Sequence, residues 1–450
     1  MSEKSNKPFI KLGFLWFTPG VSGWNLATMM FAGFGTMAMI SFMSFMQPYV
    51  LTELLNVPTE KQGALTGNLH AFQEVIFILV AGFIGAISDK LGRPLVYGSG
   101  FLIVALGYAL YPVTDSITQL YIVRGLFAVG VAMVAIMLSA CTVDYIQERS
   151  RGRWVGIMSI FNGLGIVSMS AMLSRLPSMY ENAGNDVITA GKLSFWTVSG
   201  LCLFVGLVLV TGLYRASGSH DDEHANLLGK VKEGIKAGIA SPRLAIAYGG
   251  AFIGRGDFAV IGTFFSLWLT QVGIEQGMSS ADALKKAGLF FAGIQICALI
   301  WAPVMGIMTD RMRRITAVAI GLAIAGSGYV LMGLVPDPFG PWMIPAAVIL
   351  GMGETSVIVS VAALLGQESD SPHRGAIVGV FGLLGGLGIL VTTLLGGQIF
   401  DAISRTSPFI MMGLMNLALM LAALWVRSSQ QHTEEDFRVS SWDNTKTENG

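Results

Sequence analysis

Twelve apolar stretches, separated by shorter polar ones, account for most of the chain. Each is long enough to cross about 30 Å of hydrocarbon as a helix. Helices are expected because lipid cannot satisfy unpaired backbone N–H and C=O groups. The pattern predicts an all-α membrane protein with twelve transmembrane helices, at about residues 27–50, 64–87, 95–113, 118–142, 153–174, 194–214, 244–271, 287–309, 315–335, 341–366, 374–400 and 406–427.

One long polar insert, 216–242, divides the spans into six plus six. Its Ser, Gly, His, Asp and Glu residues predict a solvated cytoplasmic linker. The predicted parts are an N-terminal segment 1–26, a six-helix bundle 27–214, the linker 215–243, a second six-helix bundle 244–427 and a tail 428–450. We expect the polar tail to be disordered.

The N-terminal segment mixes aromatic residues such as Trp16 and Phe17 with Lys4, Lys7 and Lys11. Apolar and cationic side chains together are typical of a segment that lies on a membrane surface, so we expect it on the cytoplasmic face of the bilayer. The short apolar core and small-residue cleavage site of a secretory signal are not evident in these first residues.

The two sets of spans are repeats of each other. An offset of about 221 aligns Gly33 with Gly254 and Glu74 with Gln295, and an offset of 223 aligns Gly163-Leu-Gly165 with Gly386-Leu-Gly388. Two six-helix bundles in the same orientation imply a pseudo-two-fold axis along the membrane normal. Transporters of this kind hold their substrate near the midplane between the halves and move it by alternating access.

A charged loop follows the second span of each half. The first reads Gly82-Phe-Ile-Gly85-Ala-Ile-Ser-Asp89-Lys90-Leu-Gly92-Arg93-Pro94, and the second Pro303-Val-Met-Gly306-Ile-Met-Thr-Asp310-Arg311-Met-Arg313-Arg314. Small residues at Gly85 and Gly306 predict a close approach of two helices in each copy. An acid and several cations then stand at the membrane surface.

This loop resembles the signature loop of the major facilitator superfamily, which recurs in degraded form in the second half. The second copy departs from the pattern because Met312 stands where the turn glycine would be. The resemblance covers about residues 27–427 and implies secondary active transport. The charges of both copies, with Asp144, predict ion-pair latches that gate the cytoplasmic side: Asp89, Lys90, Gly92, Arg93, Asp144, Asp310, Arg311 and Arg314.

Charge and composition narrow the function further. The chain is 53% hydrophobic and only 12% charged, and its formal net charge is zero, so nothing favours a nucleic-acid partner. Most Lys and Arg fall in the segments that are cytoplasmic when both termini are inside. We therefore expect a multi-pass protein of the plasma (cell inner) membrane. Cys141, Cys202 and Cys297 lie in apolar runs and predict neither a disulfide framework nor a metal site.

Ionisable residues inside spans are costly and point to function. Arg255 and Asp257 fall near the middle of the seventh span, and at this spacing they point about 200° apart unless Gly254 and Gly256 break the helix. We predict that Arg255 binds an anionic group of the substrate and that Asp257 carries a proton. The alternative is that each residue pairs with a neighbouring helix and only braces the bundle.

Three further spans carry such residues. Glu354 lies midway along the tenth span, which the resemblance places on the central cavity, so we expect it to bind substrate or a proton and to face Arg255 or Arg124. Glu74 is a second candidate proton site, and His70 lies one turn away on the same face. Arg124 begins a stretch similar to the family's fourth-helix motif, which implies a role in coupling. Structural ion pairs or bracing are the alternatives.

The predicted function is proton-coupled transport of a small organic, anionic solute, with uptake by symport favoured because the antiporter motif of the fifth span is missing. A proton-driven exporter, an uncoupled facilitator and a transport-dead ligand sensor remain open. No P-loop or nucleophile–base pair is evident, so neither ATP-driven transport nor an enzyme is supported. We expect no cofactor, a monomer, and the solute, protons and the lipid bilayer as partners.

Overall fold

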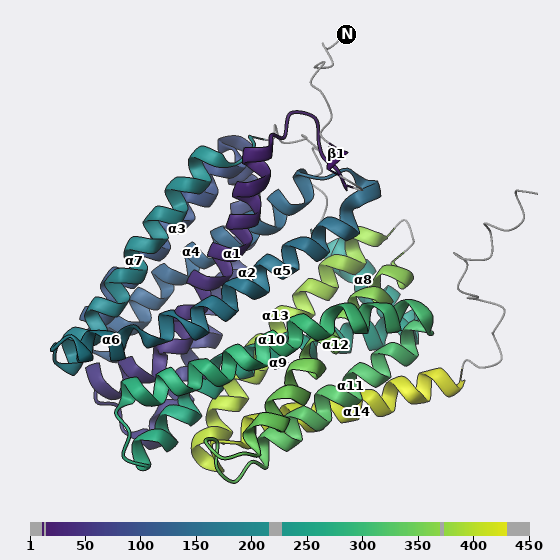
Figure 1. Ribbon diagram of the computed structural model, residues 1–450. Helices are drawn as coiled ribbons and strands as arrows, with labels where there is room; N and C mark the ends of the chain where they lie inside the picture. Colours follow the sequence, from purple (N-terminus) through teal and green to yellow (C-terminus); the bar gives the residue numbers. More distant parts are fainter. Residues whose placement is uncertain (1–10, 13–14, 216–226, 370–372, 430–450) are drawn as a thin grey trace, which may run out of the picture. The chain divides into compact units, whose positions relative to one another are not determined.

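The computed structural model describes residues 11–12, 15–215, 227–369 and 373–429. Within these ranges the chain is almost entirely helical (Figure 1). Its elements are β1 (Lys11–Leu12), β2 (Leu15–Trp16), α1 (Gly23–Tyr49), α2 (Thr59–Leu91), α3 (Arg93–Leu110), α4 (Ile117–Asp144), α5 (Arg151–Ala171), α6 (Leu176–Asn182), α7 (Val187–Gly212), α8 (Leu227–Ala240), α9 (Pro242–Glu275), α10 (Ser280–Arg311), α11 (Arg314–Gly333), α12 (Met343–Glu368), α13 (Arg374–Ala402) and α14 (Ser407–Ser429).

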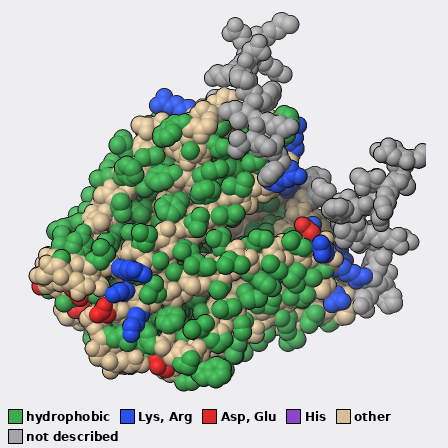
Figure 2. Space-filling view, viewed as in Figure 1, with side chains coloured by type: hydrophobic (Ala, Val, Ile, Leu, Met, Phe, Trp, Pro, Cys, Tyr) green, Lys and Arg blue, Asp and Glu red, His purple; other side chains and the backbone are tan. Residues whose placement is uncertain are grey.

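The twelve predicted spans are confirmed. Among the described residues, twelve helical segments are long and apolar enough to cross a membrane. Several run past the apolar stretch into polar residues, so the second span is Thr59–Leu91 and the seventh is Pro242–Glu275. The two short helices α6 and α8 were not predicted, because neither has the length of a span. Hydrophobic side chains cover much of the surface, and charged ones gather near helix ends (Figure 2).

The chain forms two compact units. The first consists of residues 1–222 and 266–292, and the second of residues 223–265 and 293–450. The first unit therefore contains α1 to α7 together with the end of α9 and the beginning of α10. The second contains α8, the rest of α9 and α10, and α11 to α14.

The predicted internal repeat appears in the packing of each unit. In the first unit α3 packs against both α4 and α7, and in the second unit α11 packs in the same way against α12 and α14. The aligned glycines also have equivalent surroundings. A Cβ at Gly165 of α5 would lie 2.2 Å from the carbonyl oxygen of Phe34 in α1, and one at Gly388 of α13 would lie 2.0 Å from that of Phe252 in α9. Both glycines allow two helix backbones to touch.

Gly254 and Gly256 do not break the seventh span. Helix α9 is continuous from Pro242 to Glu275. Gly254 and Gly256 serve packing instead: a Cβ at Gly256 would lie 2.8 Å from the Thr392 side chain, and one at Gly254 would lie 3.1 Å from that of Val357. Close packing against α12 and α13 requires small residues here without interrupting the helical hydrogen bonds.

The described part of the N-terminal segment packs against the first unit. Strands β1 and β2 form a two-stranded antiparallel hairpin, and the chain then runs along the connection between α4 and α5. Phe17 is fully buried and packs edge-on against Trp154 of α5, with ring centroids 5.5 Å apart. The Arg149 guanidinium lies over the Trp16 ring at 3.5 Å. These aromatic side chains pack against protein, and the expected position of the segment on the bilayer surface stays a prediction.

The predicted solvated linker contains a helix. Helix α8 fills residues 227–240 and packs against α13. The Tyr248 hydroxyl of α9 donates a hydrogen bond to the Gly234 carbonyl of α8 at 2.9 Å. The polar run 217–224 and the predicted disordered tail beyond residue 429 lie outside the described residues.

Candidate functional site

Asp257 is completely buried and held by neutral partners in the second unit. The Asn416 side-chain amide of α14 donates to both carboxylate oxygens, at 2.9 and 3.0 Å. The Tyr329 hydroxyl of α11 donates to the Asp257 carbonyl at 2.7 Å. Asn416 Nδ2 also donates to the Met412 carbonyl, while its Oδ1 is buried without a partner among the described residues. Asp257 therefore joins α9 to α14 and α11.

Glu354 is the second buried carboxyl group of this unit, with 3% of its surface exposed. Among the described residues its carboxylate accepts one hydrogen bond, from Gln295 Nε2 of α10 at 3.5 Å. Within the described residues of this unit, no cation lies within ion-pair distance of the Glu354 carboxylate, and the expectation that Glu354 faces Arg255 or Arg124 stays a prediction. Gln295 occupies the position that the repeat aligns with Glu74. An ionised carboxylate without a cation is costly in apolar surroundings, so this group suits transient protonation or contact with a cargo.

Arg255 differs from its neighbour Asp257 in that its side chain is exposed. Because α9 is unbroken, the two side chains leave the helix in nearly opposite directions. The Arg255 stem lies beside α13, where a Cβ at Gly385 would be 3.0 Å from Arg255 Cγ. Among the described residues no carboxylate forms an ion pair with Arg255. The guanidinium therefore keeps its donors available.

Arg124 is the buried cation of the first unit. It is fully buried in α4, its Nη2 lies 3.3 Å from His70 Nε2 of α2, and its guanidinium carbon lies 5.7 Å from the centre of the Phe127 ring. Arg124 Nε and Nη1 have no hydrogen-bond partner among the described residues. No carboxylate there lies within ion-pair distance of Arg124. The structure thus brings the two predicted residues Arg124 and His70 together without a counter-charge.

A second polar pair lies in the same unit. The Tyr111 hydroxyl donates to Gln47 Oε1 of α1, and the Gln47 amide nitrogen is buried without a recorded partner in the described chain. Tyr111 also lies within electrostatic reach of Arg124. Glu74, the other predicted proton site, is half-buried on α2, on the same helix as His70.

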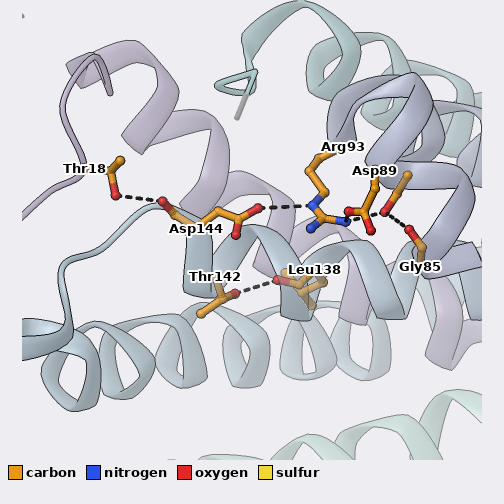
Figure 3. A network of polar contacts seen from close by, with 8 residues as sticks. Thr18, Gly85, Asp89, Arg93, Leu138, Thr142 and Asp144 are labelled. Carbon is orange, nitrogen blue, oxygen red and sulfur yellow. Dashed lines mark hydrogen bonds and ion pairs between the residues drawn. The ribbon is translucent and has the colours of Figure 1, made fainter. Parts of the chain in front are cut away.

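The first copy of the charged loop forms a network that joins three helices (Figure 3). Arg93, at the start of α3, reaches Asp89 of α2 at 2.9 Å and Asp144 of α4 at 3.1 Å. It also donates to the Ser88 hydroxyl, which in turn donates to the Gly85 carbonyl at 2.7 Å. We call Asp89, Arg93 and Asp144 the latch. Lys90 is exposed and, in the described chain, forms no ion pair.

The second copy of the charged loop forms a weaker ion pair than the first. Asp310 is 75% exposed and lies 3.8 Å from Arg314, and Arg311 is exposed with no ion pair in the described chain. The two turns also differ. Gly92 has φ +90°, a conformation that favours glycine, whereas Met312 has no positive φ. The second turn therefore does not need a glycine, which explains the departure at Met312.

Neither signature glycine lies against another helix of its own unit. Among the described residues, no atom lies within 4 Å of a Cβ built at Gly85 or Gly306. Close approach occurs instead at Gly165 and Gly388, farther along each half.

Several polar residues were missed by the sequence interpretation. Asn416, Gln295 and Gln47 are neutral amides inside apolar spans, and a search for polar as well as ionisable residues in spans would have found them. The first unit also holds a polar cluster away from the latch. There, Gln271 Nε2 donates to Gln62 Oε1 at 3.0 Å, and the Ser280 hydroxyl donates to the Glu53 carboxylate. In the described residues no group of three or more His, Cys, Asp or Glu side chains is placed to hold a metal ion.

Sequence relatives cover nearly the whole chain. The magnetosome protein MamZ of Paramagnetospirillum magneticum is 26% identical over 90% of this chain, which spans 62% of that protein's length. The magnetosome protein MamH of the same organism is 24% identical, over 86% of this chain and 89% of MamH. The class E tetracycline resistance protein of Escherichia coli is 24% identical, over 74% of this chain and 77% of that protein.

The fold also matches solved structures. The crystal structure of the nucleoside transporter NupG superposes with a TM-score of 0.71 at 13% identity, covering 90% of this chain and 99% of NupG. The family model described as Major Facilitator Superfamily matches residues 26–293 and 247–444. Membership of this family indicates a transporter and not an enzyme. With its twelve spans, its repeated halves and a signature loop whose charges form an ion-pair network, the chain belongs to the Major Facilitator Superfamily.

Proposed function

We propose that the chain is a proton-coupled secondary transporter of a small organic solute with an anionic group, working by alternating access. The observation that carries this proposal is that each unit buries an ionisable side chain with no opposite charge beside it in the described residues. These are Arg124 in the first unit and Glu354 in the second. Such groups are rarely kept in a membrane protein unless a cargo or a proton visits them.

The roles of the other residues follow from their contacts. Arg255 is the proposed anchor for the solute's anionic group, since it is exposed and holds no carboxylate among the described residues. A guanidinium binds a carboxylate or phosphate through two parallel hydrogen bonds. Among the carboxyl groups, Glu354 is the better-supported proton carrier, because Asp257 is already held by two hydrogen bonds from Asn416. Glu74 remains an additional candidate, and Arg124 with His70 would tune coupling.

Uptake into proteoliposomes under an imposed pH gradient tests this proposal. A thermal-shift screen of anionic solutes on the purified chain first selects a ligand. Arg255→Ala should abolish its binding, whereas Arg255→Lys, which keeps the charge, should retain part of it. Glu354→Gln should still exchange the solute but no longer move protons with it. Unchanged binding in Arg255→Ala would contradict the anchor, and unchanged proton movement in Glu354→Gln would contradict the carrier.

A proton-driven exporter is the second candidate, and a relative favours it, since one of the similar proteins is named for tetracycline resistance. The missing antiporter motif in the fifth span speaks for uptake instead. The direction of solute movement in vesicles of known orientation separates the two. Flux without any dependence on the pH gradient would indicate a facilitator, and binding without flux would indicate a sensor. We expect a protein of the plasma membrane with both termini in the cytoplasm.

A further inference from the structure

Helix α8 has one face that is firmly docked within the second unit. Gly234 and Gly238 form this face: a Cβ at Gly234 would lie 2.5 Å from the Ala376 carbonyl oxygen of α13, and one at Gly238 would lie 2.5 Å from the Tyr248 ring of α9. The hydrogen bond from Tyr248 to the Gly234 carbonyl completes the contact. The helix is therefore held in one orientation, which fixes what its other face presents.

The opposite face combines two isoleucines with two lysines. Ile235 is 47% exposed and Ile239 is 81% exposed. Lys232 and Lys236 are exposed as well, and neither forms an ion pair among the described residues. Residues 232, 235, 236 and 239 share one side of a helix, because they are three or four positions apart. In water alone, exposing the apolar side chain of Ile239 so fully would be unfavourable.

The helix also stands where a membrane surface would be. It ends at Ala240, directly before the membrane span that begins at Pro242. Ser241, between them, donates a hydrogen bond to Glu368 at the end of the span α12, at 3.2 Å. Two spans thus end beside α8, so its exposed face lies at the depth where hydrocarbon gives way to headgroups.

The charge of α8 indicates which type of lipid it binds. The helix carries Lys230, Lys232 and Lys236 against a single acid, Glu233, which lies 3.6 Å from His373. At a membrane surface, isoleucines enter the boundary of the acyl chains while lysines extend their amino groups to the headgroups. Lysines in this position attract anionic lipids. A protein partner would need a surface of acidic and apolar residues to cover these lysines and isoleucines. No described residue indicates such a partner.

We propose that the exposed face of α8, formed by Lys232, Ile235, Lys236 and Ile239, binds the anionic headgroups of the membrane leaflet beside the two spans. The helix is then an interfacial anchor of the second unit. This inference does not depend on which solute the protein moves.

The position of Ile239 relative to the lipid tests the proposal. The full chain with Cys297→Ser is labelled with a nitroxide at Ile239→Cys, since Cys141 and Cys202 are buried. It is reconstituted in vesicles of phosphatidylcholine, with or without phosphatidylglycerol. Collision rates are measured with oxygen, which enters lipid, and with a water-soluble nickel complex. With phosphatidylglycerol, oxygen collisions should exceed nickel collisions, and K232Q/K236Q should reduce that ratio several-fold.

The charge-matched control is K61Q/K286Q, which also removes two exposed lysines but lies outside α8, and it should leave the ratio unchanged. A label that meets mainly the nickel complex in both lipids would overturn the proposal. So would a label that is equally immersed without phosphatidylglycerol or unmoved by K232Q/K236Q. Protection from both reagents would indicate that protein covers α8, which also overturns it.

Discussion

Single residues decide how buried charge is tolerated in each unit. Asp257 and Arg255 are two positions apart, yet one is fully buried and hydrogen-bonded while the other is exposed. The sequence showed that both residues are unusual in a span and that an unbroken helix would point their side chains in nearly opposite directions. It could not show that Asn416, about 160 residues away, supplies the donors for Asp257, because such a contact depends on which helix faces which.

The Asp257–Asn416 contact should stabilise the second unit. Asn416→Leu keeps the side chain's size but leaves a buried carboxylate without donors, which should cost about 3 kcal/mol of folding free energy. We expect a clearly lower melting temperature in detergent. Asp257→Asn should lose much less folding free energy, because an amide can still accept a hydrogen bond from Asn416.

The same pair of variants separates bracing from proton transport. If Asp257 only braces the bundle, Asp257→Asn should keep proton-coupled flux. If Asp257 carries the proton, as the sequence interpretation expected, this variant should stay folded and lose proton movement. An unchanged melting temperature in Asn416→Leu would contradict the bracing role.

At the scale of helices, the repeat was the most informative part of the sequence. It predicted two equivalent bundles, and the packing of α3 and α11 agrees with that. It also aligned Gly165 with Gly388, and both lie at backbone contacts. The glycines of the signature loops looked equally suited to packing, but within its own unit neither Gly85 nor Gly306 touches a neighbouring helix. A glycine in a sequence shows that close approach is allowed, whereas the neighbouring helix decides whether it occurs.

Gly388→Ala tests the contact between α13 and α9. The added methyl group would meet the Phe252 carbonyl at 2.0 Å, so the helices must separate. Overpacking of this kind costs about 1–3 kcal/mol, and the melting temperature should fall. Gly382→Ala in the same helix is the matched control, because among the described residues no atom lies within 4 Å of its Cβ position. Equal melting temperatures for the two variants would contradict the proposed contact.

The N-terminal strap, residues 15–18, packs against the connection between α4 and α5, a contact that the apolar pattern alone did not predict. Thr18 donates from its hydroxyl to the Asp144 carbonyl at 2.8 Å, and its backbone N–H donates to the Tyr145 carbonyl at 3.1 Å. Burial raises the pKa of Tyr145, so this phenol stays neutral and accepts a hydrogen bond from the Tyr214 backbone N–H at 2.6 Å. The strap therefore holds the end of α4 that carries Asp144.

Phe17→Ala should loosen the strap. Removing a fully buried phenylalanine side chain costs about 3–5 kcal/mol where the cavity cannot close. We expect faster hydrogen exchange in residues 141–150 and a lower melting temperature. Trp24→Ala, which changes a side chain that is 65% exposed, is the control. Unchanged exchange in Phe17→Ala would show that the strap is held by its backbone hydrogen bonds alone.

For the whole molecule, the two signature loops are unequal although they occupy equivalent places in the repeat. In the first, Arg93 joins α2, α3 and α4, and only 18% of its side chain is exposed. In the second, a largely exposed Asp310 lies at the limit of ion-pair distance from Arg314. If a latch biases the equilibrium between two transport states, the first loop supplies most of that bias.

Asp144→Asn should therefore reduce transport more than Asp310→Asn. Partly exposed ion pairs contribute about 0–1 kcal/mol, which is too little to unfold the protein. A change near the top of that range still alters the ratio of two states several-fold, since 1.4 kcal/mol corresponds to a factor of ten. We expect near-normal melting temperatures for both variants, a several-fold lower initial rate for Asp144→Asn in proteoliposomes, and almost no change for Asp310→Asn. The initial rate of Asp89→Asn should lie between those of the other two variants, because Asp89 is 43% exposed and Asp144 only 28%. Equal rates for all three variants would mean that the network braces the loop without setting the balance between states.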